Sequence, residues 1–310
     1  MKDFSGKLAV ITGGGTGIGR ALAKQLASQG CSVAMCDISQ NDMDESCALA
    51  LEDAPQGVRV TGFLADVAIE TQLEAFRDDT LERHETDHIH LLFNNAGVSG
   101  GGSLINSPRA AWERTFAICW YGVYYSTRVF LPALMRADEG HLINVSSVNG
   151  FWASLGPDTS HTAYSAAKFA VKGFTEALVT DLRNNAPHLK ASVVMPGHIG
   201  TNIVHNTLRE FGNLAAEEIP ASLSETPDDP QAAAAAFRDN GLDPKEAAAI
   251  ILQGVRDERW RILVGVDAHA LDQAVRDNPE QAYEREFSET QVMPILSTLM
   301  VSLNQSKSDA

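Results

Sequence analysis

A tyrosine and a lysine stand four residues apart in HTAYSAAKFAVKGF, residues 161–174. The many small residues of this segment predict a close-packed helix, on which Tyr164 and Lys168 would share one face. A free phenol has a pKa of about 10 and transfers protons poorly at neutral pH. An ammonium group within roughly 4–6 Å would favour the phenolate and lower that pKa. The pair could be a tuned acid and base, or an ordinary contact on a helix surface, because the spacing alone fits both.

A glycine-rich stretch, TGGGTGIG at 12–19, follows an apolar run and opens a helical pattern. Glycines let the backbone approach a pyrophosphate, and a helix N-terminus offers unpaired N–H groups and a positive dipole end. The stretch lacks the Gly-Lys-Ser/Thr ending of a nucleoside-triphosphatase loop.

Asp37 is expected at the end of the second strand, eighteen residues beyond Gly19. A carboxylate at this place accepts hydrogen bonds from a ribose 2′-hydroxyl and would repel a 2′-phosphate. No arginine or lysine lies within the glycine stretch to compensate that repulsion. The expected cofactor is therefore NAD rather than NADP.

The elements that carry these residues alternate between β-rich runs and helical patterns over the first 200 residues. This alternation predicts an α/β fold, a doubly wound, Rossmann-type parallel sheet of about seven strands flanked by helices on both faces. The clearest helices are expected at 17–30, 108–135 and 164–183. The strands are expected at 7–12, 31–37, 58–67, 89–97, 141–147, 190–197 and 260–266.

Residues 1–275 are predicted to form a single dinucleotide-binding and catalytic domain. Within it, residues 201–245 contain four prolines and an acidic cluster. Loops of this length in compact domains often serve as lids, so the segment is interpreted as a substrate-loop insertion. Residues 276–310 are expected to form a C-terminal extension. Its apolar part, 292–303, is too short to span a membrane and would pack on this subunit or on a neighbour.

The composition narrows the possible partners and the location. The chain has 310 residues, 44% of them hydrophobic, and a formal net charge of −16. Nucleic acid and anionic membranes are not expected as partners, because phosphate binding needs clustered lysines and arginines. With no signal-peptide pattern and no apolar run of membrane-spanning length, the expected location is cytoplasmic.

Cysteines and histidines give no sign of a metal site. The four cysteines form no C-x-x-C pair and are interpreted as free thiols in a reducing compartment. The three histidines of HETDHIH, residues 84–90, have no thiolate or well-placed carboxylate set beside them. No metal is therefore expected.

Taken together, the motifs resemble the short-chain dehydrogenase/reductase family. The glycines follow its T-G-x-x-x-G-x-G spacing, and four further motifs follow in the family's order: NNAG (94–97), INVSS (143–147), YSAAK (164–168) and PGHIGT (196–201). The resemblance covers residues 5–205 well and 240–275 loosely. It implies an NAD-dependent oxidoreductase that transfers a hydride between NAD and a secondary alcohol or ketone.

The resemblance also implies roles for individual residues. Tyr164 would donate or accept the proton, Lys168 would hold the nicotinamide ribose and lower the tyrosine pKa, and Ser147 would hydrogen-bond the substrate oxygen. Such a proton is needed because the cofactor supplies only the hydride. The other implied cofactor contacts are Thr12, Gly13, Gly17, Ile18 and Gly19 at the pyrophosphate, Asp37 at the adenosine ribose, Asp66 and Val67 (ending the third strand) at the adenine, Asn95, Ala96 and Gly97 beneath the cofactor, and Pro196, Gly197, Ile199 and Thr201, the last two near the carboxamide.

Two features depart from the family pattern. The loop after Ser147 is longer than usual, with its excess around 157–162, and Phe151, Trp152 and Leu155 would line the substrate mouth with apolar groups. Cys119 stands where the family usually has an asparagine, thought to hold a water that links the lysine to solvent. A thiol is a weak hydrogen-bond partner. Either another group rebuilds the proton path or turnover is impaired; we favour the first, since the rest of the site is intact.

The apolar loop suggests a moderately apolar cyclic, aryl or steroid-like substrate, and His198 would either complete the pocket or serve only in a turn. An alternative function is an NAD-binding sensor or assembly protein with little catalysis, which Cys119 favours. Sugar-nucleotide epimerases share Tyr-x-x-x-Lys but usually differ in glycine spacing and have a larger C-terminal region. By resemblance, a homodimer or homotetramer built on the helices at 108–135 and 164–183 is expected.

Overall fold

The computed structural model describes residues 1–156, 159–212 and 230–295 of the chain. Three regions named above therefore fall partly outside the described residues. They are the long loop before Tyr164 (157–158), the 201–245 insertion (213–229) and the C-terminal extension (296–310).

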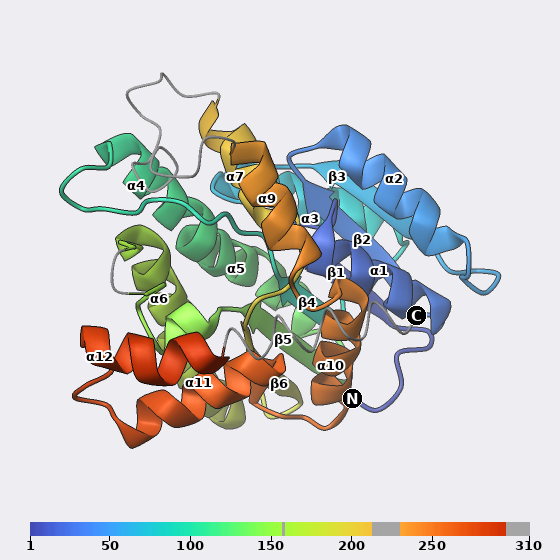
Figure 1. Ribbon diagram of the computed structural model, residues 1–310. Helices are drawn as coiled ribbons and strands as arrows, with labels where there is room; N and C mark the ends of the chain where they lie inside the picture. The colour runs from blue at the N-terminus through green and yellow to red at the C-terminus, as the bar shows by residue number, and fades with distance from the viewer. Residues whose placement is uncertain (157–158, 213–229, 296–310) are drawn as a thin grey trace, which may run out of the picture.

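Seven parallel strands form one sheet in the order β3-β2-β1-β4-β5-β6-β7 (Figure 1). This arrangement, with helices on both faces, confirms the predicted fold class. The strands are β1 (Leu8–Thr12), β2 (Ser32–Asp37), β3 (Val60–Leu64), β4 (Leu91–Asn94), β5 (Gly140–Val145), β6 (Leu189–Pro196) and β7 (Arg261–Val264).

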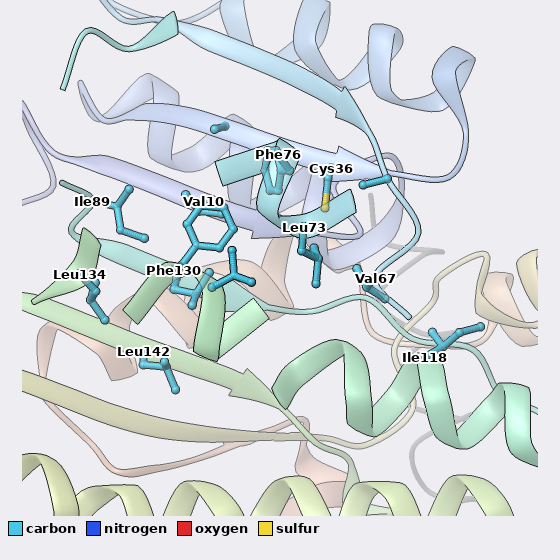
Figure 2. Close-up of a cluster of buried hydrophobic side chains, with 14 of the residues drawn as sticks. Val10, Cys36, Val67, Leu73, Phe76, Ile89, Ile118, Phe130, Leu134 and Leu142 are labelled. Carbon is cyan, nitrogen blue, oxygen red and sulfur yellow. The ribbon is translucent and has the colours of Figure 1, made fainter. Parts of the chain in front are cut away.

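Helices cover both faces of the sheet, so its central strands β1, β4 and β5 are buried on both sides. In β1, Ala9 and Ile11 pack with α1 (Gly17–Ser28) and α10 (Pro244–Arg256). Their neighbours Leu8 and Val10 face the opposite layer, which contains α3 (Glu70–Arg83), α5 (Gly122–Leu134) and α6 (Thr162–Asn185). Figure 2 shows part of this second layer, where side chains of α3 and α5 meet those of the central strands.

Of the remaining helices, α2 (Gln40–Leu51) adds Ala50 to the same layer as α1 and α10. The helices predicted at 17–30 and 164–183 agree with α1 and α6 to within two residues at each end. No helix among the described residues is long and apolar enough to cross a membrane. The other helices are α2 (Gln40–Leu51), α4 (Arg109–Phe116), α7 (Ile203–Gly212), α9 (Pro230–Asp239), α11 (Val266–Asp277) and α12 (Arg285–Phe287).

The strands predicted over 58–67 and 89–97 are too long, since β3 ends at Leu64 and β4 at Asn94. Asp66 and Val67 therefore do not end a strand but follow it. The Asp66 N–H donates to Gln72 Oε1 at 2.7 Å, and Asp66 Oδ1 accepts from the Ala68 N–H at 2.9 Å. Such local side-chain hydrogen bonds compete with the sheet ladder and turn the chain toward α3.

The single helix predicted over 108–135 is interrupted. A π-helical turn at Ala117–Tyr121 separates α4 from α5. Cys119 lies inside this turn, fully buried, and its Sγ donates a hydrogen bond to the Val98 carbonyl at 3.3 Å. Turns of this type are rare and are frequent at functional sites, and periodicity in the sequence does not reveal them.

A third apolar cluster joins the C-terminal part of the chain to the loop after β5. Trp152 of this loop packs with Leu271 of α11, with Phe287 of α12 and with Val292. The Trp152 indole also donates to the Ala282 carbonyl at 2.8 Å. As far as residue 295, the C-terminal extension thus packs on its own subunit, next to the long loop that precedes Tyr164.

Candidate active site

A cavity of about 450 Å³ lies at the carboxyl ends of the strands, beside the point between β1 and β4 where the strand order reverses. Ligands of open α/β sheets bind at such a point. Of the residues predicted for the site, Thr12 and Gly19 stand behind the lining. Those that line it are Gly13, Gly17, Ile18, Asp37, Asp66, Val67, Asn95, Ala96, Gly97, Ser147, Tyr164, Lys168, Pro196, Gly197, Ile199 and Thr201.

Thr12 and Gly19 support the glycine loop from behind. Thr12 Oγ1 accepts hydrogen bonds from the N–H groups of Asn95 (3.0 Å) and Ala96 (3.1 Å), which ties β1 to the segment after β4. A Cβ on Gly19 would overlap the carbonyl oxygen of Gly13. Gly13 itself has a φ of +66°, a left-handed conformation that favours glycine.

The N-terminus of α1 is suited to hold an anion. Thr16 occupies the N-cap position without a side-chain cap, and its hydroxyl instead accepts from Asn206 Nδ2 at 3.1 Å. The first turn of the helix contains no acidic residue. Its N–H groups and the positive end of the dipole are thus left for a ligand such as a pyrophosphate.

Asp37 at the end of β2 is held in one orientation by backbone groups. Its Oδ2 accepts from the Gly15 N–H at 2.9 Å and its Oδ1 from the Ser39 N–H at 3.1 Å. Burial raises the pKa of this carboxyl group, and the two N–H groups act in the opposite direction.

The two arginines that line the cavity are both paired with carboxylates. Arg114 forms ion pairs with Asp66 at 2.8 Å and with Glu210 of α7 at 2.7 Å. Arg209, also on α7, pairs with Asp42 at 3.0 Å. Both guanidinium groups are therefore already engaged by carboxylates of the chain itself.

Ser147, Tyr164 and Lys168 meet in the cavity although they come from two elements. Ser147 follows β5 and caps a 3₁₀ turn, accepting the Asn149 N–H on its Oγ at 3.1 Å. The first turns of α6 carry the other two residues, and Lys168 Nζ lies 5.3 Å from the centre of the Tyr164 ring. All three side chains are buried, and Lys168 Nζ donates to the Val145 carbonyl at 3.0 Å.

Burial is the largest influence on the pKa values of Tyr164 and Lys168. It raises the pKa of Tyr164, which the neighbouring Cys119 raises further and a hydrogen bond with Ser147 lowers. It also lowers the pKa of Lys168. The expected lowering of the Tyr164 pKa is therefore wrong for the protein alone, because burial disfavours the phenolate, and the contribution of Lys168 stays a prediction. With its pKa raised, Tyr164 is a neutral phenol at neutral pH.

His161 lies directly beside Tyr164 in the site, and the sequence did not predict it as a site residue. Its ring stacks on that of Tyr164, with centroids 4.6 Å apart, and its Nε2 lies 3.4 Å from Ser99 Oγ. Burial lowers its pKa to about 4, so the imidazole is neutral. It stands three residues before Tyr164, but nothing in its local sequence distinguishes it from a helix-capping residue.

The predicted lining of the substrate mouth is partly correct. Trp152 and Leu155 line the cavity. Phe151 does not; its ring packs against the Arg261 guanidinium, with the Arg261 Cζ 5.8 Å from the centre of the Phe151 ring. His198 also lines the cavity, but its Nε2 is engaged by the Phe237 carbonyl at 2.8 Å. Ile203 and Asn206 of α7, within the predicted substrate-loop insertion, also line the cavity. Further lining residues come from the C-terminal part of the chain and were not predicted: Asp267 and Leu271 of α11, and Ser288, Val292 and Met293.

Comparison with known proteins agrees with this geometry. A family model described as short chain dehydrogenase matches residues 7–211. The chain belongs to the short-chain dehydrogenase/reductase family. SadH of Mycobacterium tuberculosis is 34% identical to this family member over 279 residues, which cover 89% of the chain and 92% of SadH.

Solved structures of the short-chain dehydrogenase/reductase family include complexes with either form of the cofactor. One from Burkholderia phymatum in complex with NAD has a TM-score of 0.74 and 30% identity, covering 91% of this chain and 95% of its own. A metagenomic short-chain oxidoreductase in complex with NADP has a TM-score of 0.55 and 30% identity, covering 62% and 83%. The protein is thus an oxidoreductase of a family that binds nicotinamide cofactors.

Proposed function

We propose that this protein transfers a hydride between NAD and a secondary alcohol or its ketone. The observation that carries the proposal is that one cavity is lined by the glycine loop and Asp37 and also by Ser147, Tyr164 and Lys168. A candidate dinucleotide site and a proton-transfer group therefore share one cavity.

The described residues fit a bound dinucleotide. The uncapped N-terminus of α1 would hold the pyrophosphate, and Asp37 would accept the adenosine ribose hydroxyls. When bound, the nicotinamide ring supplies or receives the hydride. Asn95 would lie beneath it, fixed by its Nδ2, which donates to the carbonyls of Thr12 (3.1 Å) and Gly13 (3.0 Å).

The proton on the reacting oxygen is handled by the chain's own side chains. Tyr164, a neutral phenol, would donate its proton to a ketone oxygen and take one back from an alcohol in the reverse direction. Ser147 would hold the same oxygen by a hydrogen bond. Of the three Lys168 N–H donors, the Val145 carbonyl takes one, which leaves the others for ribose hydroxyls and for the phenolate formed after proton transfer.

The substrate end of the cavity supports a moderately apolar cyclic, aryl or steroid-like substrate. Trp152 and Leu155 lie there, and Leu271, Val292 and Met293 reach it from the C-terminal part of the chain. Apolar walls with few polar groups bind such ligands by removing their surface from water. The Ser147 and Tyr164 hydroxyls would then select the position of the oxygen.

Absorbance at the reduced-cofactor band, followed with NAD and with NADP over a panel of secondary alcohols and ketones, tests the proposal. We expect turnover with NAD on apolar members of the panel. Tight NAD binding without turnover on any of them would favour the alternative, a sensor or assembly protein, for which Cys119 is the supporting residue. A clear preference for NADP would contradict the role of Asp37.

Asp37→Asn is expected to reduce the preference for NAD over NADP by about ten-fold in kcat/KM, because it removes the charge that repels a 2′-phosphate. The amide oxygen can still accept the Gly15 N–H, whereas the Ser39 N–H would face the amide nitrogen and lose its acceptor. Asp53→Asn, at an exposed carboxylate that pairs with Lys24, is the matched control. An unchanged cofactor ratio would show that Asp37 does not read the ribose.

Cys119→Asn is expected to change turnover by less than about three-fold, because we infer that another group already serves the proton path. Cys119 lies close to that path: a Cβ on Gly97 would be 3.5 Å from Lys168 Nζ and 3.7 Å from Cys119 Sγ. The measurement is the steady-state rate of each protein. Their melting temperatures are compared to show that both are folded to the same extent. A large gain for the asparagine variant would show instead that the native relay is defective.

We further propose a homodimer or homotetramer that uses α5 and α6. Two aromatic residues support this: Tyr121, just before α5, and Phe169 of α6 are 41% and 40% exposed. Exposed aromatic side chains are frequent at protein interfaces. A cytoplasmic location remains part of the proposal, on the grounds given with the composition.

A further inference from the structure

Asp267 is a buried carboxylate that lines the cavity and has no part in the proton chemistry above. It lies in the first turn of α11 and is 2% exposed. Its Oδ2 accepts the backbone N–H of His198 at 2.6 Å. A Cβ on Gly197 or on Gly265 would overlap its carboxylate, so both loops approach it as closely as only glycine allows.

The Asp267 carboxylate is buried without a cationic partner among the residues that the structure describes. Within residues 1–156, 159–212 and 230–295, no ion pair involves Asp267; on α11 it is Asp272 that pairs with Arg261 and Arg276. Burying a charge without an opposite charge is unfavourable. The N-terminal end of the α11 dipole and the His198 N–H favour the anion here, but neither supplies a full positive charge.

The partner that Asp267 lacks could be supplied by the ligand. This step rests on the proposed function, in which the loop that carries Gly197 and His198 lies at the nicotinamide. The oxidised nicotinamide ring carries a positive charge, and the reduced ring does not. In alcohol oxidation the carbinol carbon gives its hydride to the ring while the hydroxyl proton goes to the Tyr164 phenolate, so the charge on the ring disappears.

We infer that Asp267 supplies a fixed negative charge beside the nicotinamide, so that the protein discriminates in favour of the oxidised cofactor. The same charge makes the bound reduced cofactor a better hydride donor, because positive charge develops on the ring as the hydride leaves. Lys168, which also lines the cavity, has the opposite effect; its Nζ donates to the Val145 carbonyl, and substitution of Asp267 leaves this contact in place.

A purely structural role of Asp267 predicts a different result for its asparagine variant. If Asp267 served only to hold the His198 N–H, a neutral oxygen at the same place would serve as well. Asp267→Asn keeps that acceptor and nearly the same shape but removes the charge. The variant therefore separates an effect of the charge from an effect of the loop position.

The test is direct binding of NAD and of NADH, each titrated separately by calorimetry into the native protein and into Asp267→Asn. The ratio Kd(NAD)/Kd(NADH) is expected to rise by about five- to ten-fold in the variant, in proportion to a charge interaction in a partly screened site. Asp277→Asn is the control. It removes a charge from the same helix at an exposed position, where the carboxylate accepts from Gln273 Nε2 and does not line the cavity, and it should leave the ratio unchanged.

The outcomes distinguish this inference from the proposed function. If the native protein binds neither NAD nor NADH, the proposed function fails. If it binds both and the ratio is the same in Asp267→Asn, the inference about Asp267 is wrong and the proposed function stands. Should Asp267→Asn not fold, Asp267→Ser, which is also neutral and keeps a hydroxyl near His198, is measured against the same expected shift.

Discussion

Tyr164→Phe is expected to lower turnover by about 10²- to 10⁴-fold while NAD binding stays within about three-fold, because only the proton-transferring oxygen is lost. The ring fills the same buried space and keeps its stacking with His161 and its position beside Lys168. Loss of the phenol leaves the substrate oxygen with the Ser147 hydroxyl alone. Turnover measured with saturating NAD, together with NAD binding by calorimetry, separates chemistry from cofactor affinity.

The pH dependence of the native enzyme follows from the same phenol. Since burial raises the pKa of Tyr164, the group is protonated at neutral pH and can act as an acid in ketone reduction. Alcohol oxidation needs the phenolate, so its rate should rise with pH well into the alkaline range. Tyr121→Phe, at an exposed tyrosine, serves as the control. Undiminished oxidation in Tyr164→Phe would remove the basis of the proposed mechanism.

Gly19→Ala is expected to weaken NAD binding by about 100-fold or more. The new Cβ would overlap the Gly13 carbonyl oxygen and would also lie 2.8 Å from Asn95 Nδ2. Backbone atoms cannot rotate out of the way as a flexible side chain can, so the loop must move away from the start of α1. Its N–H groups then no longer converge on a pyrophosphate, and hydrogen bonds to a charged group contribute about 1.5–3 kcal/mol each.

Gly173→Ala is the matched control for the glycine variant. It adds the same methyl group in α6 at a position where a Cβ meets no heavy atom within 4 Å. There alanine should stabilise the helix slightly and leave NAD affinity unchanged. Equal affinity for NAD in Gly19→Ala and the native protein, with both folded by circular dichroism, would show that the loop does not bind the pyrophosphate.

Local motifs account for most of what the sequence predicted correctly. The glycine loop, the fold class and the lining positions of Ser147, Tyr164 and Lys168 depend on short-range rules: glycine where the backbone must turn, apolar runs of strand length, and the four-residue period of a helix face. Such rules act over a few residues, so they can be applied to the sequence without the structure.

Errors arose where tertiary contacts outweigh local preference. The helix predicted over 108–135 contains a π turn, in which Cys119 is buried and donates to the Val98 carbonyl, and Asp66 follows β3 and pairs with Arg114. The pKa of Tyr164 is raised, opposite to expectation, because burial of the phenol disfavours its charged form. The spacing of apolar residues in the sequence does not reveal how deeply a given side chain will be buried.

The amino-acid sequence by itself determined the family, the layered sheet and the identity of the groups that can handle a phosphate and a proton. Only the tertiary structure decided which distant residues join them. Asp267 comes within 2.6 Å of the His198 N–H from 69 positions along the chain, and Arg114 reaches Glu210 across 96. The physical reason is that burial and charge act through space, and the distance through space between such residues is set by packing of whole helices rather than by spacing along the chain.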